Sequence, residues 1–314
     1  MTDSDYAGLL EAWNIDFTAV ETDFVIGGSP ERSVFRTVVR DTSGDLWVLE
    51  RIEEANLERK CEVAETLDNL SSQIDRIHAW RRTGSNLFFQ TFEKRIWMLR
   101  PYVEGVPLDR ETWLDDDWRM DAMGDFLVQL KEYDGHPSGD FFSIAEYATE
   151  RIIAWRRNFP VLAQTLEPFF KSLNKTFFSI HDSLPMAFCH GDFHPLNVVW
   201  GDQRIRSVID WEFCGIKPEL YDVALLLGCA GFDDPDNLIS KPAVRLIGRL
   251  QSAGFGMPQS WECLIGLTAS IRFGWMSEWI RRQDDEAAEM EAVYLGILVD
   301  QADYISKTWM TRVP

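Results

Sequence analysis

The stretch FCHGDFHPLNVVWGDQRIRSVIDWE, from Phe188 to Glu212, constrains this chain more than any other part of the sequence. It contains two runs apolar enough to be buried strands, NVVW and IRSVID, yet it also carries several acidic, amide and imidazole side chains. Polar groups inside apolar strands cost free energy unless they are paired or functional. The stretch therefore predicts a buried structural unit that also carries chemistry.

The turn GDQR between the two runs predicts a β-hairpin. Residues at the open end of an antiparallel hairpin lie beside each other. We therefore expect Asn197, at the start of the first strand, to meet Asp210, at the end of the second. Asp192 lies five residues before Asn197, in a turn kinked by Gly191 and Pro195, and can close over the same point.

These oxygen donors suit a hard cation. Magnesium takes oxygen ligands and usually binds one or two carboxylates together with substrate phosphates and water. We assign Asn197 and Asp210 to the metal, which leaves Asp192 free to accept a proton from an attacking hydroxyl. Glu212 is expected either to bind metal or substrate or to form an ordinary salt bridge.

The rest of the chain predicts an α+β fold in two lobes. Residues 23–52 and 86–103 each read as strands around a turn, and residues 53–74 between them have helical periodicity. From residue 104 onward amphipathic helices dominate, including 118–133, 144–159 and the segment 261–309. We expect a β-rich lobe over residues 1–100, a hinge at 101–107 and a larger helical lobe over 108–314.

Composition excludes several classes of protein. The net charge of −20 leaves no surplus of Lys and Arg to neutralise nucleic-acid phosphates; it suits a cationic substrate, or simply solubility. Five scattered cysteines predict neither a disulfide framework nor a zinc site. The N-terminal stretch lacks the order of a signal peptide, and no apolar run is long enough to span a membrane. We expect a cytoplasmic protein of unknown oligomeric state.

The motif HGDFHPLN followed by IDWE resembles the catalytic and metal-binding segments of the aminoglycoside phosphotransferase and choline kinase superfamily. The resemblance implies a protein-kinase-like fold and transfer of the γ-phosphate of ATP to a hydroxyl, with Mg²⁺ as cofactor. It implies Asp192 as the catalytic base and Asn197 and Asp210 as the metal ligands. His190 and His194 are expected to brace the loop rather than to catalyse.

Asp222 begins a very apolar helix and is expected to be its N-cap. The resemblance places here an aspartate that steadies the catalytic loop.

The resemblance also implies a nucleotide site in the first lobe. The segment IGGSPERSVFR resembles the loop that covers the phosphates, and WMLRPYVEG resembles the hinge that binds adenine through the Pro101 carbonyl and the Val103 amide. The nucleotide-binding residues expected in these two segments are Gly28, Ser29, Leu99, Pro101 and Val103.

One position departs from the family pattern. Related kinases carry a strand lysine that holds the phosphates and pairs with a helix glutamate, but this chain reads WVLERI, with Glu50 in the place of that lysine. Strand alternation puts Leu49 and Arg51 on one face. If that face is turned to the nucleotide, Arg51 replaces the lysine, paired with Glu62 or, as an alternative, Glu65.

Two functions fit these features. The first is a phosphotransferase that uses ATP and Mg²⁺ and acts on a hydroxyl of a small molecule that is aminoglycoside-, choline-, homoserine- or sugar-like. The second, motivated by the missing lysine, is a catalytically impaired nucleotide-binding or regulatory protein. The acceptor site is expected to draw on IRFGWMSEWIRR, in particular on Trp275 and Glu278.

Overall fold

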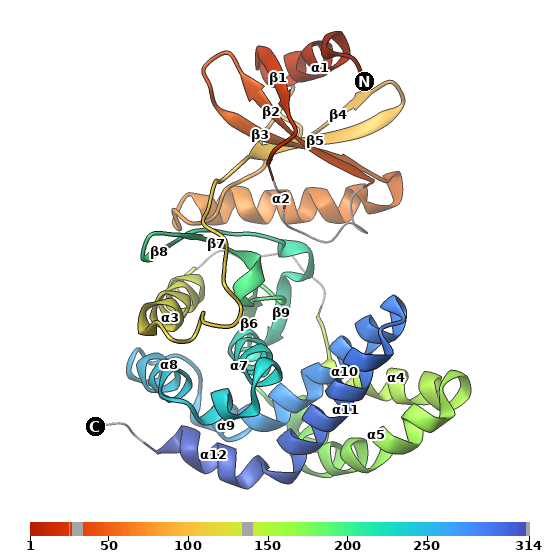
Figure 1. Cartoon of the computed structure of the whole chain (residues 1–314), viewed down its shortest axis with the longest axis vertical. Coiled ribbons are helices and arrows are strands. Elements are labelled where there is room, and N and C mark those ends of the chain that lie inside the picture. The colour runs from red at the N-terminus through yellow and green to blue at the C-terminus, as the bar shows by residue number, and fades with distance from the viewer. Residues whose placement is uncertain (25, 27–33, 134–140, 312–314) are drawn as a thin grey trace. The chain divides into compact units, whose positions relative to one another are not determined.

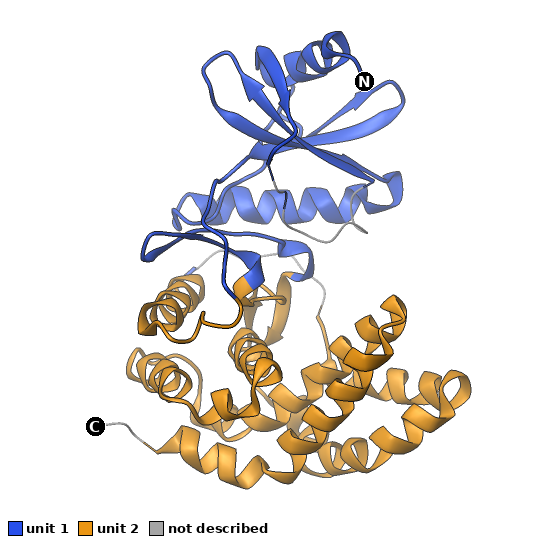
Figure 2. Ribbon diagram, viewed as in Figure 1, with its two compact units in different colours: residues 1–109, 133–138, 196–213 blue, residues 110–132, 139–195, 214–314 orange. Residues whose placement is uncertain are grey.

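The computed structural model of this chain describes residues 1–24, 26, 34–133 and 141–311. The chain divides into two units (Figure 2). Unit 1 comprises Met1–Asp109, Tyr133–Ser138 and Leu196–Phe213, and unit 2 comprises Arg110–Glu132, Gly139–Pro195 and Cys214–Pro314. The sequence divides the chain at a hinge over 101–107, whereas the structure changes unit at residue 109 and also groups 196–213 with the first unit.

Unit 1 is built on an antiparallel sheet in the order β1-β2-β3-β5-β4 (Figure 1). Two of its hairpins are the ones that the turn sequences DTSGD and EKR predict. The strands are β1 (Phe17–Glu21), β2 (Phe35–Asp41), β3 (Leu46–Ile52), β4 (Phe89–Phe92) and β5 (Arg95–Pro101).

Each face of strand β3 meets a different helix. Helix α1 (Asp3–Leu10) shares a core with Trp47 and Leu49, whereas α2 (Leu57–Ser71) meets the opposite face through Glu50. The short helices η1 (Glu11–Trp13) and η2 (Glu54–Asn56) precede β1 and α2. The first helix starts with a capping box between Thr2 and Asp5, which satisfies two terminal amides.

A separate hairpin of β7 (Val198–Gly201) and β8 (Arg204–Val208) also belongs to unit 1 and is followed by η5 (Trp211–Phe213). It is tied to the chain after β5, because Val106 and Trp200 form a β-bridge in which the Val106 amide donates to the Trp200 carbonyl at 2.8 Å. A Cβ at Gly105 would lie 2.8 Å from that carbonyl oxygen. Only glycine allows the two segments to approach this closely.

Unit 2 is mainly helical and contains one two-stranded sheet, β6 (Met186–Cys189) paired with β9 (Gly215–Pro218). Its core lies between α7 (Tyr221–Asp233) and α10 (Leu264–Arg282), whose inward residues are almost all buried. The other elements are α3 (Asp117–Lys131), α4 (Ile144–Asn158), α5 (Pro160–Leu173), η3 (Asn174–Phe178), α6 (Ser179–His181), η4 (Pro195–Asn197, which ends in unit 1), α7 (Tyr221–Asp233), η6 (Pro235–Ile239), α8 (Lys241–Ser252), α9 (Pro258–Glu262), α10 (Leu264–Arg282), α11 (Asp285–Asp300) and α12 (Ala302–Met310).

The predicted fold class is confirmed: a sheet-based N-terminal lobe is followed by a larger helical lobe. The amphipathic segments at 118–133 and 144–159 form α3 and α4, and the segment 261–309 consists of helices. Within the described ranges, every helix is too short or too polar to cross a membrane.

Candidate active site

The hairpin β7–β8 brings Asn197 and Asp210 to one end, as its sequence predicts. Val198 pairs with Val208, and the Ile209 amide donates to the Asn197 carbonyl at 2.9 Å. Both polar residues lie just outside the strands rather than within them, since β7 begins at Val198 and β8 ends at Val208. The Asn197 side chain is buried, which is typical of a positioned amide.

The backbone of Asp210 adopts the left-handed conformation, with φ of 64°. This region is uncommon for residues with a Cβ, although Asp and Asn tolerate it best. Such a residue costs about 1–3 kcal/mol and persists only where its surroundings determine it. Here Trp211 Nε1 donates to the Val208 carbonyl at 2.9 Å, and the Val208 amide donates to the Arg76 carbonyl at 3.0 Å.

The oxygen donors at this end of the hairpin suit a magnesium ion that is bound together with phosphate groups. Asn197 and Asp210 supply one amide oxygen and one carboxylate, and Mg²⁺ commonly binds one or two protein carboxylates with water and phosphate oxygens completing its shell. Among the residues that the structure describes, no three or more His, Cys, Asp or Glu side chains gather to hold a metal ion by themselves.

A buried charge cluster occupies the contact between β3 and α2. Lys60 Nζ lies 2.9 Å from Glu50 Oε1 and also forms a close ion pair with Glu212 Oε1. Glu50 is in turn 3.4 Å from an Arg36 nitrogen. The Lys60 and Glu50 side chains are 3% and 2% exposed, so this pair is shielded from water.

The expected pairing of Arg51 with Glu62 is not the one that the structure contains. Arg51 shares its strand face with Leu49, which is buried in the core beneath α1, and the face that meets α2 carries Glu50. Glu62 pairs with Arg59 on its own helix at 3.2 Å. The interaction between strand and helix therefore has a carboxylate on the strand and an ammonium on the helix.

The other nucleotide-site predictions have different outcomes. Leu49 and Leu99 are fully buried in the α1 core, so neither presents a surface to a ligand. Pro101 ends β5 and Val103 follows it half-buried, in the segment that the resemblance identifies as the hinge. Gly28 and Ser29 lie outside the described residues.

In unit 2, Asp222 holds the loop that carries Asp192. The amides of His190 and Gly191 donate to its two carboxylate oxygens at 2.7 and 2.8 Å, and the Asp192 amide donates to His190 Nδ1 at 3.2 Å. Gly191 has φ of 83°, a conformation suited to glycine. Burial raises the pKa of the Asp222 carboxyl, while His190 and the two amides oppose this shift.

The expectation that Asp222 is an N-cap is wrong. The N-cap of α7 is Leu220, and Asp222 lies in the first turn with its carboxylate directed to the loop. The bracing role implied by the family resemblance agrees with these hydrogen bonds, and the fully buried ring of His190 accepts the amide of Asp192.

His194 connects this loop to α10. Its Nε2 is 3.7 Å from Asp192 Oδ1, and its ring packs edge-on against Trp275 with centroids 5.8 Å apart. Trp275 in turn packs against Trp279 at 5.7 Å. An aromatic surface on α10 therefore lies next to the loop that carries the proposed base.

Glu278, predicted to bind substrate, is already paired. Two hydrogen bonds from Arg281 and one from Arg282 lower the pKa of its carboxyl. The three residues follow one another along α10, at i+3 and i+4 spacing. Glu278 therefore belongs to a surface ion-pair network in this structure.

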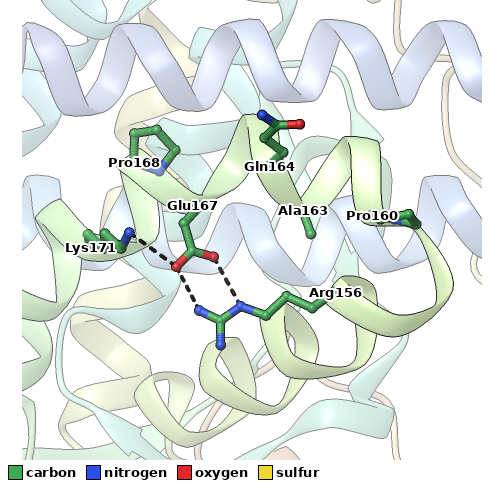
Figure 3. Close-up of a pocket in the computed structure, with 7 residues that line it drawn as sticks. All are labelled: Arg156, Pro160, Ala163, Gln164, Glu167, Pro168 and Lys171. Carbon is green, nitrogen blue, oxygen red and sulfur yellow. Dashed lines mark hydrogen bonds and ion pairs between the residues drawn. The ribbon is translucent and has the colours of Figure 1, made fainter.

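A pocket of about 450 Å³ lies between α4 and α5 (Figure 3). Glu167 binds Arg156 at 2.7 Å and Lys171 at 3.5 Å within it, and the Arg156 guanidinium lowers the pKa of the Glu167 carboxyl. The sequence motifs contribute no residue to its lining, which consists of Arg156, Pro160, Ala163, Gln164, Glu167, Pro168 and Lys171.

Lys60 is the residue that motif reasoning missed. It lies on the apolar stripe of α2, three residues before Val63 and seven before Leu67, both of which are buried. A lysine at such a position is rarely fully buried unless it is paired. Its place in the helical periodicity could therefore have identified a buried ion pair.

Comparison with known proteins supports one family. A model of the phosphotransferase enzyme family matches residues 30–259. No curated protein matches the sequence. Many solved structures share the fold, and three of them serve as examples. A putative aminoglycoside phosphotransferase from Ralstonia eutropha has a TM-score of 0.65 at 14% identity, with 96% of this chain and 98% of that chain covered.

The macrolide 2′-phosphotransferase of Brachybacterium faecium has a TM-score of 0.61 at 15% identity, with 93% and 97% covered. An amicoumacin kinase, solved with AMP-PNP and Ca²⁺, has a TM-score of 0.61 at 12% identity, with 91% and 90% covered. The family model spans well over half of the sequence and includes both the loop held by Asp222 and the hairpin β7–β8. This chain belongs to the phosphotransferase enzyme family.

Proposed function

We propose that this protein transfers the γ-phosphate of ATP, with Mg²⁺, to a hydroxyl group of a small molecule. Asp192 is the base, and Asn197 and Asp210 are the metal ligands. The observation that carries the proposal is the register of β7–β8, which brings Asn197 and Asp210 to one end of a hairpin. Asp192 is five residues from Asn197 along the chain, so the two residues lie no more than about 18 Å apart even in extended backbone.

The chemistry of these residues suits phosphoryl transfer. Asp192 would accept the proton of the acceptor hydroxyl while the hydroxyl oxygen forms a bond to the γ-phosphorus. The bond between the γ-phosphorus and the oxygen that it shares with the β-phosphate breaks, and ADP leaves. When bound, Mg²⁺ would offset the negative charge on the phosphates. The bonds from His190 and Gly191 to Asp222 keep the loop from rearranging, which favours a fixed direction for the base.

The donor set and the relatives support the choice of co-substrate. Asn197 and Asp210 fit a hard cation bound through phosphates, and the amicoumacin kinase was solved with an ATP analogue and Ca²⁺. The acceptor would be aminoglycoside-, choline-, homoserine- or sugar-like, and a cytoplasmic location belongs to the same proposal. Glu50 in the place of a strand lysine favours the second candidate, a nucleotide-binding protein without turnover.

Replacement of Asp192 by Asn separates these two functions. Phosphate transfer from Mg·ATP and Mg·GTP would be followed by ³¹P NMR over a panel of aminoglycosides, macrolides, amino alcohols and sugars, and nucleotide binding by calorimetry. Asp202→Asn is the matched control, because Asp202 lies exposed in the turn between β7 and β8.

For a kinase, Asp192→Asn lowers transfer by about 10²–10⁴-fold, the usual contribution of a positioned base, and leaves the nucleotide dissociation constant unchanged. Asp202→Asn behaves as the wild type. Nucleotide binding without transfer to any acceptor in the panel would support the non-catalytic function instead. Equal transfer by Asp192→Asn and wild type would remove Asp192 from the mechanism.

A further inference from the structure

Two consecutive side chains of helix α2 bind the segment that follows the hairpin β7–β8. Lys60 forms a close ion pair with the Glu212 carboxylate, and an Arg59 nitrogen donates to the Glu212 carbonyl at 3.1 Å. One residue of η5 is therefore held by both its side chain and its backbone. All of these contacts lie within unit 1.

The contacts of Lys60 extend to the sheet of unit 1. Lys60 Nζ also binds Glu50 on β3 at 2.9 Å, and Glu50 is 3.4 Å from Arg36 on the neighbouring strand β2. Arg36, Glu50, Lys60 and Glu212 alternate in charge along these contacts. The Arg100 guanidinium on β5 is a further positive charge that interacts with Glu50, Asp210 and Glu212. Removal of one member of such a set leaves an uncompensated charge.

Asp210 lies two residues before Glu212 and has the left-handed backbone described above. A conformation of this kind needs a fixed environment on both sides. Strand β8 holds the segment before it, through the Val208 amide and carbonyl. The bonds from α2 to Glu212 hold the segment after it.

From these contacts we propose that Lys60 is a positioning residue that sets the place of Asp210 through Glu212. The ion pair between strand and helix has reversed polarity in this chain, and its helix member has gained a second partner in the metal-binding segment. The inference rests on the proposed function, because it assigns Asp210 to the metal. It predicts that Glu212 acts as a structural carboxylate and not as a substrate ligand.

The positions of Glu50 and Lys60 are not equivalent, because Lys60 also pairs with Glu212. Exchange of the charges by the double substitution Glu50→Lys and Lys60→Glu would restore an ion pair between β3 and α2. It would also place a carboxylate against Glu212, where like charges repel. If Lys60 served only to join strand and helix, the exchange would be tolerated.

The test compares Lys60→Met with Lys60→Arg, Glu212→Gln and the charge exchange. Arg82→Met is the matched control, because the ion pairs of Arg82 join it to Glu65 and Asp68 on the same helix α2. Three quantities are measured: Mn²⁺ affinity in the presence of AMP-PNP by electron paramagnetic resonance, affinity for metal-free ATP by calorimetry, and hydrogen exchange of the amides of residues 209–213.

We expect Lys60→Met and the double substitution Glu50→Lys with Lys60→Glu to weaken Mn²⁺ binding about tenfold or more, which is the usual effect of losing a residue that orients a metal ligand. Both variants should also speed hydrogen exchange at the amides of residues 209–213. Lys60→Arg keeps the positive charge, so its Mn²⁺ affinity and its hydrogen-exchange rates at 209–213 should be close to those of the wild type. Glu212→Gln keeps the Lys60–Glu50 pair and hence the fold, and should show the same changes more weakly. Arg82→Met should lower the melting temperature without changing metal affinity.

Unchanged Mn²⁺ affinity and unchanged exchange in both Lys60→Met and Glu212→Gln would overturn the inference. Weaker binding of metal-free ATP by Lys60→Met would also overturn it, because this result would mean direct contact with phosphates. If the wild type binds neither nucleotide nor Mn²⁺, the proposed function fails, and the exchange rates at 209–213 still decide whether Lys60 holds the segment.

Discussion

The ion pair between Arg272 and Glu291 joins α10 to α11, and its loss should destabilise unit 2 strongly. Glu291 Oε1 is 2.5 Å from Arg272 Nε, and Oε2 is 2.6 Å from a terminal guanidinium nitrogen. Trp279 Nε1 donates to the same carboxylate at 2.9 Å. Burial alone would lower the pKa of Arg272, but Glu291 outweighs it and raises that pKa.

The substitution Glu291→Gln keeps the shape of the side chain and removes its charge. The side chains of Arg272 and Glu291 are 2% and 0% exposed, so the guanidinium would remain unpaired and shielded from solvent. Breaking a buried pair by removing one partner costs about 3–5 kcal/mol. For a folded unit of this size, that corresponds to about 6–20 °C in melting temperature.

Urea unfolding followed by tryptophan fluorescence measures this cost. Glu289→Gln is the control, since Glu289 is exposed on the same helix, and it should lie within about 0.5 kcal/mol of the wild type. The double substitution Arg272→Met with Glu291→Leu should recover most of the loss, because apolar residues of similar volume replace buried pairs without a large penalty. A loss below about 1 kcal/mol for Glu291→Gln would refute the reasoning, since a buried unpaired charge costs more than that.

Three further predictions concern the loop and the close approaches of the backbone. The raised pKa of Asp222 contributes stability that is fully present below the ordinary value of 3.8 and is lost as pH rises through the folded value. The stability of Asp222→Asn relative to wild type should therefore increase between pH 4 and pH 7 in urea unfolding, and a constant difference would contradict the shift. Gly105→Ala places a Cβ 2.8 Å from the Trp200 carbonyl oxygen and should speed hydrogen exchange at the Val106 amide; unchanged exchange would mean that the bridge accommodates a methyl group. Gly231→Ala meets the Tyr294 hydroxyl and should cost about 1–3 kcal/mol through overpacking, measured by thermal melting; an unchanged melting temperature would contradict the packing.

The sequence predicted the hairpin that carries Asn197 and Asp210 because strand propensity, a turn and polar residues at its open end all agree. The hairpins β2–β3 and β4–β5 of the sheet followed from the same kind of pattern. The predicted bounds differ at the ends, where Asn197 and Asp210 fall outside β7 and β8.

The partners of buried charges could not be predicted in this way. Alternation correctly put Glu50 and Arg51 on opposite faces of β3, but it does not say which face packs against α2. That choice depends on α1, which covers the Leu49 face. Once that face is covered, Glu50 meets α2, and Lys60 is the cation placed to pair with it.

The role of Asp222 shows a similar limit. An aspartate at the start of an apolar helix favours an N-cap, yet its carboxylate accepts the amides of His190 and Gly191, which lie more than thirty residues earlier in the chain. Hydrogen bonds over such a separation depend on tertiary packing. Local sequence preferences carry no information about them.

The most direct test of the proposed mechanism is a crystal structure of the wild type with Mn²⁺ and AMP-PNP, with the metal located by anomalous scattering. We predict an anomalous peak within coordination distance of the Asn197 amide oxygen and the Asp210 carboxylate, with the Asp192 carboxylate facing the γ-phosphate. A nucleotide-bound metal coordinated by other side chains, or an Asp192 carboxylate turned away from the γ-phosphate, would contradict it.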